Sequence, residues 1–523
     1  MLHINYKSSS VRSAFITIIN RAAVVFAAVF ILASCSSDFL DVPVQGQGTA
    51  ATDPAFAENL VVGVYNSLLS GDAFGGGDTH GIAFISCTNI ISDDADKGST
   101  AADQAGIIGD LDQLIHTPTN IFVGSLWSGY YGGIAKCNQA LTALETATVD
   151  EATKNRWIGE VRFIRGYYYF NLVRLYGGVP IVLRVPSSAA DANSDPKFQT
   201  RATRNEVYQV IKDDMQSAVD NTPLRTMTAP GRINKGTAQA MLAKVYLYEK
   251  NWTKVAELTE AVVNSGQYAL NPRYENIWRF VGNNSSESIF EIQTGTFNNS
   301  DFGVNGYCTW QGPRVGGKGG WRDLGFGFCT PTMKFVNSYT AGDVRKNATI
   351  ISIDNSGKGI GTILFDGFRI PSADSVQNLF YNYKAYHSEN PDFEPFINNR
   401  DQKQKNIHIL RFADVLLMQA EAANELNNPS LAISNVNLLR TRAGLSGINA
   451  GGGQALRQAI WSERRYELAM EHDRFFDMVR TGVAAEAFAA DGKIFVIGKH
   501  EVLPIPALQI ELSGDLLKQN SGY

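Results

Sequence analysis

Two stretches of the chain share one pattern, and that pattern restricts the fold more than any other feature of the sequence. Residues 237–266 read TAQAMLAKVYLYEKNWTKVAELTEAVVNSG, and residues 412–444 read FADVLLMQAEAANELNNPSLAISNVNLLRTRAG. Each predicts a helix rich in small residues, a short polar turn containing Asn, and a second helix. This length and alanine pattern is typical of a tetratricopeptide-type hairpin. Because one hairpin cannot bury its apolar face alone, we expect neighbouring helices to stack on it.

Helical periodicity continues in the segments beside these hairpins. Apolar side chains recur every three or four residues from Trp157 to Leu175, as they do along one face of a helix. The sequence GGVP at 177–180 ends that helix with glycine and then proline. Further helical segments are predicted at 125–147, 430–441 and 455–480.

The helical pattern is interrupted in the middle of the chain. The two clear hairpins begin 175 residues apart, so they are not consecutive repeats of one solenoid. Between them, residues 271–400 are rich in Gly, Asn and aromatic residues and show few helical periods. The sequence therefore predicts a mostly α fold, with a helical scaffold at about 50–270 and 401–480 and an inserted irregular, loop-rich subdomain at about 271–400.

The first 34 residues are predicted to be an export signal rather than part of the fold. Lys7, Arg12 and Arg21 supply positive charge, and the apolar run Ala22 to Leu32 has the length of a signal core, about 7–15 residues. A spanning helix needs about 20 apolar residues. An uncleaved anchor would have to bury Arg21, and a plain secretion signal would leave Cys35 in place by chance. Leu-Ala-Ser-Cys resembles a lipobox, the motif at which bacterial lipoproteins are cut and lipidated, so Cys35 is the predicted lipidation site and the domain is 35–523.

Charge and cysteine content exclude some classes of function. The whole chain has a formal net charge of −5, and removal of the signal takes away three cations and no acid, which leaves −8. Nucleic acid is therefore not an expected partner, because phosphate binding requires clustered positive charge. Four cysteines follow Cys35, and sequence alone does not choose among their three possible pairings. A bridge between Cys308 and Cys329 is conceivable, and four buried free thiols are at least as well supported.

No catalytic, cofactor or metal signature stands out. The chain has no P-loop, no G-x-S-x-G, no H-E-x-x-H and no dinucleotide fingerprint. The segment SDDADKG at 92–98 alternates Asp residues as a calcium loop does, but Ala105 stands where the bidentate Glu of an EF-hand belongs. A turn whose Asp side chains bind local backbone amides is favoured over a calcium site. We predict no catalytic residue, no cofactor and no metal.

The segment ERRYELAMEHDRFFDMVR at 463–480 carries many charges. Its acids and arginines recur every three or four residues, which predicts an ion-pair ladder along one side of a helix. A glycosidase would need one carboxyl with a raised pKa, whereas neighbouring arginines lower carboxyl pKa values. His472 is predicted to pack on an apolar helix face that contains Trp461, Leu468, Phe475 and Val479. The ladder and His472 are therefore interpreted as structural.

The segment 300–328, SDFGVNGYCTWQGPRVGGKGGWRDLGFGF, is the best candidate for ligand contact. It combines six aromatic residues with nine glycines, which an apolar core would not select. Aromatic rings on a polar loop suit stacking on a ligand with one apolar face, such as a sugar, and nearby polar groups suit its hydroxyls. The alternative is that these rings pin the loop onto the body. The ligand-contact candidates are Trp310, Trp321, Tyr307, Phe326, Arg314, Asp323 and Asn305, with Phe74 and Asp78 from the AFGGGD loop added on weaker grounds.

Several motifs occur together in one order along the chain. They are Cys35 with SSDFLD, SDDADKG, WSGYYGGIAKCN, VRFIRGYYYFNLVRLYGGVP, GRINKGTAQAMLAKVYLY, ILRFADVLLMQAEAANE, ERRYELAMEHDRFFDMVRTG and VLPIPALQIELSGDLLKQNSGY. In this order the chain resembles the SusD-like (RagB/SusD) outer-membrane nutrient-binding lipoproteins. It departs from the family pattern at His472, where a glycine is usual, and at Cys137.

The resemblance implies a SusD-like fold on tetratricopeptide-like units and a lipid-anchored position on the outer-membrane surface. It implies a non-enzymatic protein that binds glycans and delivers them to a SusC-like TonB-dependent transporter. An oligopeptide-binding member of the same family is the nearest alternative. An exported glycosidase and a purely structural adaptor for the transporter are the alternatives from other classes.

Overall fold

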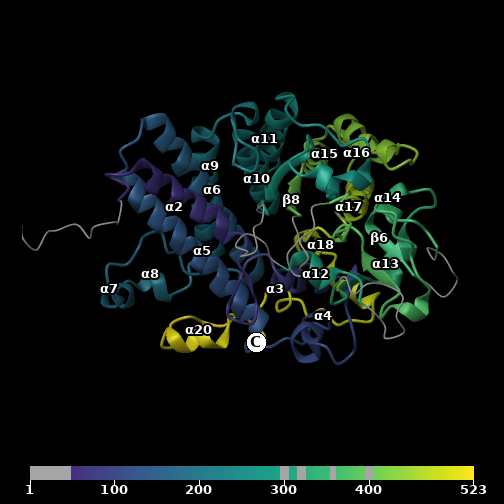
Figure 1. Cartoon of the computed structure of the whole chain (residues 1–523), viewed down its shortest axis with the longest axis horizontal. Coiled ribbons are helices and arrows are strands. Elements are labelled where there is room, and N and C mark those ends of the chain that lie inside the picture. Colours follow the sequence, from purple (N-terminus) through teal and green to yellow (C-terminus); the bar gives the residue numbers. More distant parts are fainter. Residues whose placement is uncertain (1–48, 295–305, 315–324, 354–360, 391, 395–404) are drawn as a thin grey trace, which may run out of the picture.

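The computed structural model describes residues 49–294, 306–314, 325–353, 361–390, 392–394 and 405–523 (Figure 1). The export signal, Cys35, Asn305, Trp321 and Asp323 therefore lie outside the described residues. Among the described residues, no helix combines the length and apolar character needed to cross a bilayer.

The body of the molecule is a row of packed helices. Its long members are α2 (Pro54–Ser67), α5 (Ile121–Glu145), α6 (Glu151–Tyr176), α9 (Arg204–Asn221), α10 (Lys235–Tyr248), α11 (Trp252–Asn264), α15 (Phe412–Glu425), α16 (Pro429–Arg442) and α17 (Gln454–Glu467). Each packs on a neighbour in the order α2, α5, α6, α9, α10, α11, α15, α16 (Figure 1). The helices α11 and α15, which belong to the two hairpins recognised in the sequence, lie against each other. The two hairpins are thus neighbours in space although a long insertion separates them in the chain.

Local sequence signals explain where these helices begin and end. Asp53 caps α2 by accepting a hydrogen bond from Ala55 N at 2.9 Å, and Pro54 is the first helical residue. Proline suits that position because its missing N–H has no partner within the helix. Thr203 and Glu206 form a reciprocal capping box at the start of α9. Gly177 ends α6, as the GGVP signal predicted.

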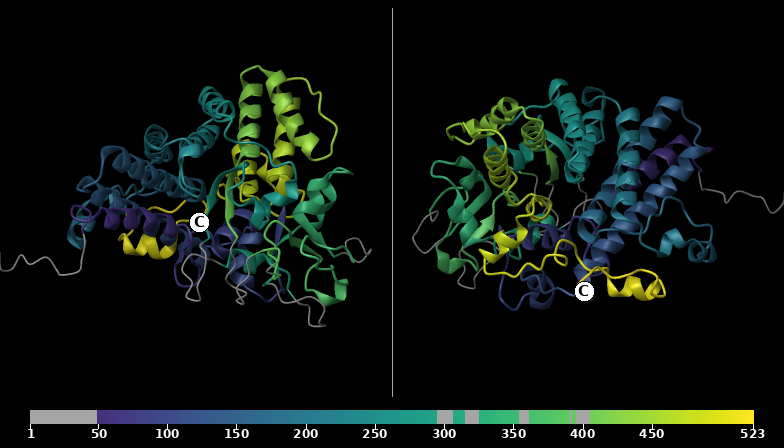
Figure 2. Two further views of the ribbon diagram at one scale, coloured as in Figure 1. Left: turned by 45° about the horizontal axis from the view of Figure 1, so that its top comes forward. Right: turned by 180° about the vertical axis from the view of Figure 1, so that it is seen from behind.

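Outside the helical row, the chain forms short strands and short helices before, between and after the two hairpins. The described residues contain four antiparallel strand pairs: β1 (Gly71–Asp72) with β2 (Gly77–Asp78), β3 (Ala95–Gly98) with β5 (Phe328–Pro331), β4 (Ser288–Ile292) with β8 (Ile407–Arg411), and β6 (Ile350–Ser352) with β7 (Phe380–Asn382). The shorter helices are α3 (Ile82–Ile85), α4 (Asp110–Asp112), α7 (Ala189–Ser194), α8 (Pro196–Gln199), α12 (Tyr307–Gln311), α13 (Met333–Ser338), α14 (Val344–Thr349), α18 (Arg474–Thr481), α19 (Ala484–Ala489) and α20 (Ala507–Leu512). Most of the inserted segment lies at the opposite end of the molecule from α2 (Figure 2).

One large apolar core runs through the helical row. Three small clusters lie apart from it, and most of their members belong to residues 274–386. Strand β4 nevertheless contributes Phe290 and Ile292 to the large core and pairs with β8 of the helical part. The boundary of the loop-rich subdomain at about 271–400 therefore stays a proposal drawn from the sequence pattern.

The helix predicted at 455–480 is two helices, which corrects the sequence-based prediction. Helix α17 ends at Glu467 and α18 begins at Arg474. Between them, Met470 and His472 have φ values of 62° and 73°, in the left-handed region that interrupts a right-handed helix. The helical spacing of apolar residues continues across residues 468–473, so the sequence pattern did not predict that the helix is interrupted there.

The four cysteines that the structure describes are buried thiols and form no disulfide bridge with one another. Cys87, Cys137 and Cys329 are free and fully buried, and Cys308 is also buried. Because Cys329 is free, the conceivable bridge between Cys308 and Cys329 is absent. Burial raises the pKa of the Cys329 thiol well above its ordinary value, which keeps it protonated and unreactive.

Candidate functional site

The aromatic segment and the AFGGGD loop meet in space. The ring of Trp310, on α12, lies 4.8 Å from Phe326, 6.0 Å from Phe328 and 6.2 Å from Phe74, measured between centroids. Phe74 also contacts Phe122, at the start of α5, edge to face at 5.3 Å. Of these rings Phe74 is the most exposed, at 51%, and Trp310 and Phe326 are half-buried. The four rings of Phe74, Trp310, Phe326 and Phe328 are called the aromatic cluster below.

The aromatic cluster combines both interpretations drawn from the sequence. Trp310, Phe326 and Tyr307 pack on the large core, so the rings do pin the segment onto the body. Trp310, Phe326 and Phe74 nevertheless keep part of their surface in solvent. Rings that are fixed on one side and open on the other suit stacking on a ligand, because little side-chain freedom is lost on binding.

Glycine in this segment permits a close return of the backbone. The chain after the undescribed residues 315–324 comes back against α12, where Phe326 N donates to Thr309 O at 2.8 Å. A Cβ atom on Gly325 would lie 2.3 Å from Thr309 O, which is closer than real Cβ atoms approach. Glycine at position 325 therefore allows Phe326 to reach the ring of Trp310.

Tyr307 is held by a buried histidine. Tyr307 Oη and His472 Nε2 are 2.8 Å apart, and His472 Nδ1 lies 2.8 Å from Thr88 Oγ1. Burial lowers the pKa of His472 well below its ordinary value, so the imidazole is neutral. His472 is thus a packed structural residue, as predicted, but the helix face expected to carry it is wrong, because His472 lies between α17 and α18. Its contact fixes the start of α12.

Arg314 is tied to a neighbouring loop. Its Nη1 donates to Ser99 Oγ at 2.6 Å and pairs with the carboxylate of Asp103. Hydrogen bonds from Thr100 and Ser99 lower the pKa of Asp103 to about 2, so this partner stays charged. The guanidinium is one-third exposed and has donors left for a ligand, but its position is set by the Asp103 contact.

Asp78 does not lie on the surface beside the aromatic cluster, which corrects its prediction as a ligand-contact residue. Its side chain is fully buried and accepts hydrogen bonds from Gly81 N at 2.5 Å and Ala83 N at 2.8 Å. Burial raises its pKa to about 7. Asp78 therefore supports the turn from β2 into α3, whereas Phe74 at the tip of the same hairpin is exposed.

The acidic segment 92–98 is part of an ion-pair network rather than a metal site. Arg474 donates to Asp93 at 2.6 and 2.7 Å, and Arg465 Nε donates to Asp94 at 2.8 Å. These partners come from the far end of the chain, so arginines rather than local backbone amides are the main partners of both carboxylates, which corrects the prediction. No group of three or more His, Cys, Asp or Glu side chains within the described ranges is arranged to hold a metal ion.

The charges of 463–480 pair across elements, which corrects the predicted single-helix ladder. Glu467 contacts Arg345, Arg411 and Arg442, and Arg464 contacts Asp414 of α15. Burial alone would raise the pKa of Glu467, but Arg442, Arg411 and Arg345 lower it to about 2. A carboxyl held in this way stays ionised and cannot act as a general acid near neutral pH.

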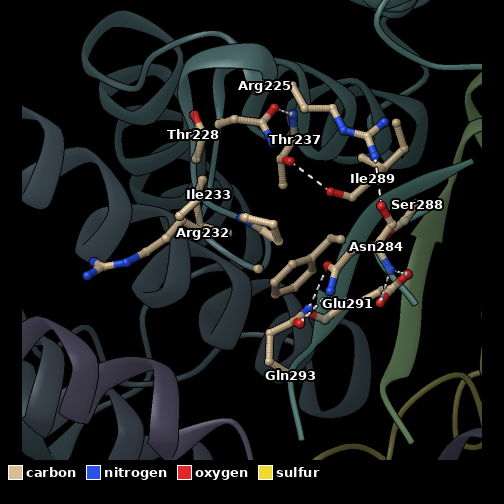
Figure 3. Close-up of a pocket in the computed structure, with 15 residues that line it drawn as sticks. Arg225, Thr228, Arg232, Ile233, Thr237, Asn284, Ser288, Ile289, Glu291 and Gln293 are labelled. Carbon is tan, nitrogen blue, oxygen red and sulfur yellow. Dashed lines mark hydrogen bonds between the residues drawn. The ribbon is translucent and has the colours of Figure 1, made fainter. Parts of the chain in front are cut away.

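A second hollow lies between α10 and β4 (Figure 3). It measures about 200 Å³, and the polar side chains of its walls already have hydrogen-bond partners within the protein. Asn284 and Gln293 exchange side-chain hydrogen bonds at 2.8 and 3.1 Å, and Asn284 N donates to Glu291 at 3.0 Å. Arg225 donates to the carbonyl oxygens of Gln267 and Ser285. No sequence motif pointed to this hollow, and its saturated walls favour a structural role.

Comparison with known proteins places these features in a family. A model described as starch-binding associating with outer membrane matches residues 85–247, and a model described as the SusD family matches residues 286–523. A SusD-like protein of Formosa agariphila is 28% identical over 427 residues, which cover 77% of this chain and 81% of the relative. A SusD-like protein of Bacteroides ovatus is 28% identical over 390 residues, which cover 68% of this chain and 64% of the relative.

Solved structures share the whole fold. A laminarin-binding SusD-like protein superposes with a TM-score of 0.74 at 28% identity and covers 90% of this chain and 99% of its own. Surface glycan-binding protein A from Bacteroides thetaiotaomicron, solved with laminarihexaose, has a TM-score of 0.73 at 23% identity, with coverages of 89% and 99%. The predicted mostly helical, SusD-like fold is confirmed. With two successive family models and full-length structural matches, the chain belongs to the SusD/RagB family of binding proteins.

Proposed function

We propose that this chain is a cell-surface lipoprotein that binds a glycan and passes it to a SusC-like TonB-dependent transporter. The observation that carries the proposal is the aromatic cluster, in which the rings of Phe74 and Trp310 come from distant segments, lie 6.2 Å apart and both keep part of their surface in solvent. Sugars offer a C–H face for stacking and hydroxyls for hydrogen bonds, and such a surface matches both. The family supports the same role, because one structural relative at 28% identity is described as laminarin-binding.

The proposed contact residues are Trp310, Phe326 and Phe74, with Arg314 at the rim and Tyr307 as the support of α12. Asn305, Trp321 and Asp323, which lie outside the described residues, are proposed from the sequence segment alone. The contact between Arg314 and Asp103 weighs against the oligopeptide alternative, because a guanidinium held by a carboxylate is less available to a peptide carboxylate.

The decisive test is binding by residues 36–523 to a panel of polysaccharides that begins with laminarin. We expect saturable binding in affinity gels or calorimetry, weakened about tenfold or more by Trp310→Ala or Phe74→Ala, because each change removes a stacking face. Phe56→Ala, which removes an exposed ring on α2, is the matched control and should leave binding unchanged. Circular dichroism melting checks that each variant is folded.

Two results would contradict this proposal. Full binding by both cluster variants would remove the aromatic cluster from the site. Saturable binding to a peptide mixture, with none to any polysaccharide, would replace the glycan assignment with the oligopeptide alternative.

A further inference from the structure

Trp461 occupies an unusual environment for a tryptophan. It lies on α17 and is only half-buried, and it packs against none of the hydrophobic clusters that the described residues form. Trp461 lines two hollows, one shared with Leu247 and Trp252 and a much smaller one shared with Arg465 and Leu468. A single half-buried ring needs no explanation by itself, but a tryptophan that lines a hollow beside a second tryptophan offers a face for a ligand.

The larger of these hollows has the composition of a binding site. It measures about 310 Å³, at the lower end of the range of about 300–1,000 Å³ that ligand pockets occupy. It lies where the α10–α11 turn, the end of α15, α17 and α18 meet. Its lining is Leu247, Lys250, Trp252, Glu421, Glu425, Arg457, Trp461, Arg480 and Thr481. Two half-buried tryptophans thus share one hollow, which we call the hairpin hollow.

The polar walls of the hairpin hollow are fixed in advance. Arg457 donates to both oxygens of Glu425 at 2.7 Å, and Arg480 donates to both oxygens of Glu421 at 2.8 and 3.0 Å. Trp461 Nε1 also donates to Glu421, at 3.0 Å, which sets the plane of the indole ring. Groups held in this way lose little freedom on binding, so their contacts favour affinity.

The pairing of these charges also selects the ligand class. Each carboxylate of the hairpin hollow is matched by a guanidinium, so neither sign is left over for a strongly charged ligand except at exposed Lys250. The rest of the hollow's surface includes the faces of two tryptophan rings and the solvent-facing edges of the two arginine–glutamate ion pairs. An uncharged, polyhydroxylated molecule with an apolar face fits such a surface, whereas an acidic or basic peptide would have to break an ion pair.

We propose that the hairpin hollow is a second carbohydrate subsite, which takes part of an uncharged oligosaccharide against Trp252 and Trp461. It shares no residue with the aromatic cluster, and it rests on the proposed function only for its ligand class. Figure 1 places α11 and α15 along one edge of the molecule and α12 nearer the opposite edge. A long glycan would thus have two separate places to bind on one protein.

The test is hydrogen–deuterium exchange of residues 36–523 with and without laminarin oligosaccharides and the other glycans that the panel identifies. We expect slower exchange in the peptides that contain α17 and the α10–α11 turn, in addition to those that contain α12. Trp461→Ala should abolish the protection at α17 and weaken polysaccharide binding about two- to tenfold. Gln458→Ala, which changes an exposed residue of the same helix outside the hollow, should do neither.

The outcomes separate the two proposals. Protection at α12 without protection at α17 would overturn the second subsite and leave the proposed function standing. Protection at α17 alone, lost in Trp461→Ala, would support the second subsite and remove the aromatic cluster from the function. No protection by any glycan at either place would overturn both. If Trp461→Ala melts early, Trp461→Phe with Trp252→Ala replaces it, and unchanged binding by that pair would also overturn the second subsite.

Discussion

At the scale of single residues, two features run against local expectation, the left-handed backbone at His472 and the buried charge of Glu467, and tertiary contacts explain both. His472 has a φ of 73°, which lies in the region that glycine adopts without strain. Its two ring nitrogens contact Thr88 and Tyr307, and these contacts offset the backbone cost. Glu467 is fully buried and is held by arginines from three other elements. Neither role is visible in the residue's immediate sequence.

Glu467 gives the protein a predictable sensitivity to acid. Its pKa is about 2 in the folded chain, against about 4.3 for an unperturbed glutamate. The folded state therefore binds a proton at Glu467 less tightly than the unfolded state does. The contribution of ionised Glu467 to the unfolding free energy is complete above pH 4.3 and is lost as the pH falls towards 2. Glu467→Gln should cost about 3–5 kcal/mol at pH 7, because it leaves three arginines short of a partner.

Urea unfolding at several pH values measures this contribution. The gap in unfolding free energy between wild type and Glu467→Gln should narrow between pH 5 and pH 3. Glu260→Gln, at an exposed position of α11, should change stability by less than about 0.5 kcal/mol. A gap that stayed constant over this pH range would show that Glu467 is not the group that titrates.

At the scale of elements, short pieces of structure position the aromatic cluster. Strand β5, which carries Phe328, pairs with β3 across 230 residues of chain, with Gly98 opposite Phe328. Helix α12 packs on α3 and β5. The cluster is therefore built by contacts between segments that lie far apart in sequence, and its geometry depends on how closely β3 and β5 approach.

Gly98→Ala should disturb that approach. Gly98 has a φ of +71°, and an added Cβ would lie 2.4 Å from the carbonyl oxygen of Gly327. We expect a loss of about 2 kcal/mol or more in unfolding free energy and weaker glycan binding, because Phe326 and Phe328 flank Gly327. Gly106→Ala is the control, since its Cβ would meet no atom within 4 Å. Unfolding midpoints and affinity gels check both effects, and equal behaviour of the two variants would contradict the prediction.

At the scale of the whole molecule, a helical row carries the loops that form the proposed site. The row is continuous in space because α11 packs on α15, and the inserted segment leaves it and returns through the pairing of β4 with β8. The proposed position on a cell surface adds the predicted lipid at Cys35, which precedes the first described residue by 14 positions. The protein is thus proposed to be anchored in the outer membrane by the lipid at Cys35, close to the folded domain in sequence.

Replacement of the lipidation residue tests that arrangement in cells. Cys35→Ala should move the full-length chain out of the outer-membrane fraction and stop its labelling by a fatty-acid probe, because lipid supplies the affinity for the bilayer. Wild-type chain should also copurify with a SusC-like transporter from detergent extracts. Cys137→Ala, at a buried thiol, is the control and should keep the lipid. Unchanged lipid labelling of Cys35→Ala would refute the lipid anchor at Cys35. Absence of the transporter from the fraction purified with the wild-type chain would refute the proposed pairing with it.

The mainly α class, most of the long helices and several of their ends could be predicted from the sequence alone. Apolar periodicity from Trp157 to Leu175, the cap at Asp53 and the stop at Gly177 act within a few residues, so they can be read locally. The aromatic segment was also recognisable, because so many rings among glycines do not suit a core. The motifs in order identified the family, although none of them fixed the contacts of an individual side chain.

Which distant groups meet follows from the packing of the whole chain and could not be predicted from local sequence. The tertiary structure paired Asp93 and Asp94 with arginines some 370 residues away, buried Asp78, broke the helix at His472 and left Trp461 outside the core. The physical reason is that periodicity says which face of a helix is apolar, but not which partner covers that face. That choice depends on the packing of the whole chain, where a charge must find its opposite before it can be buried.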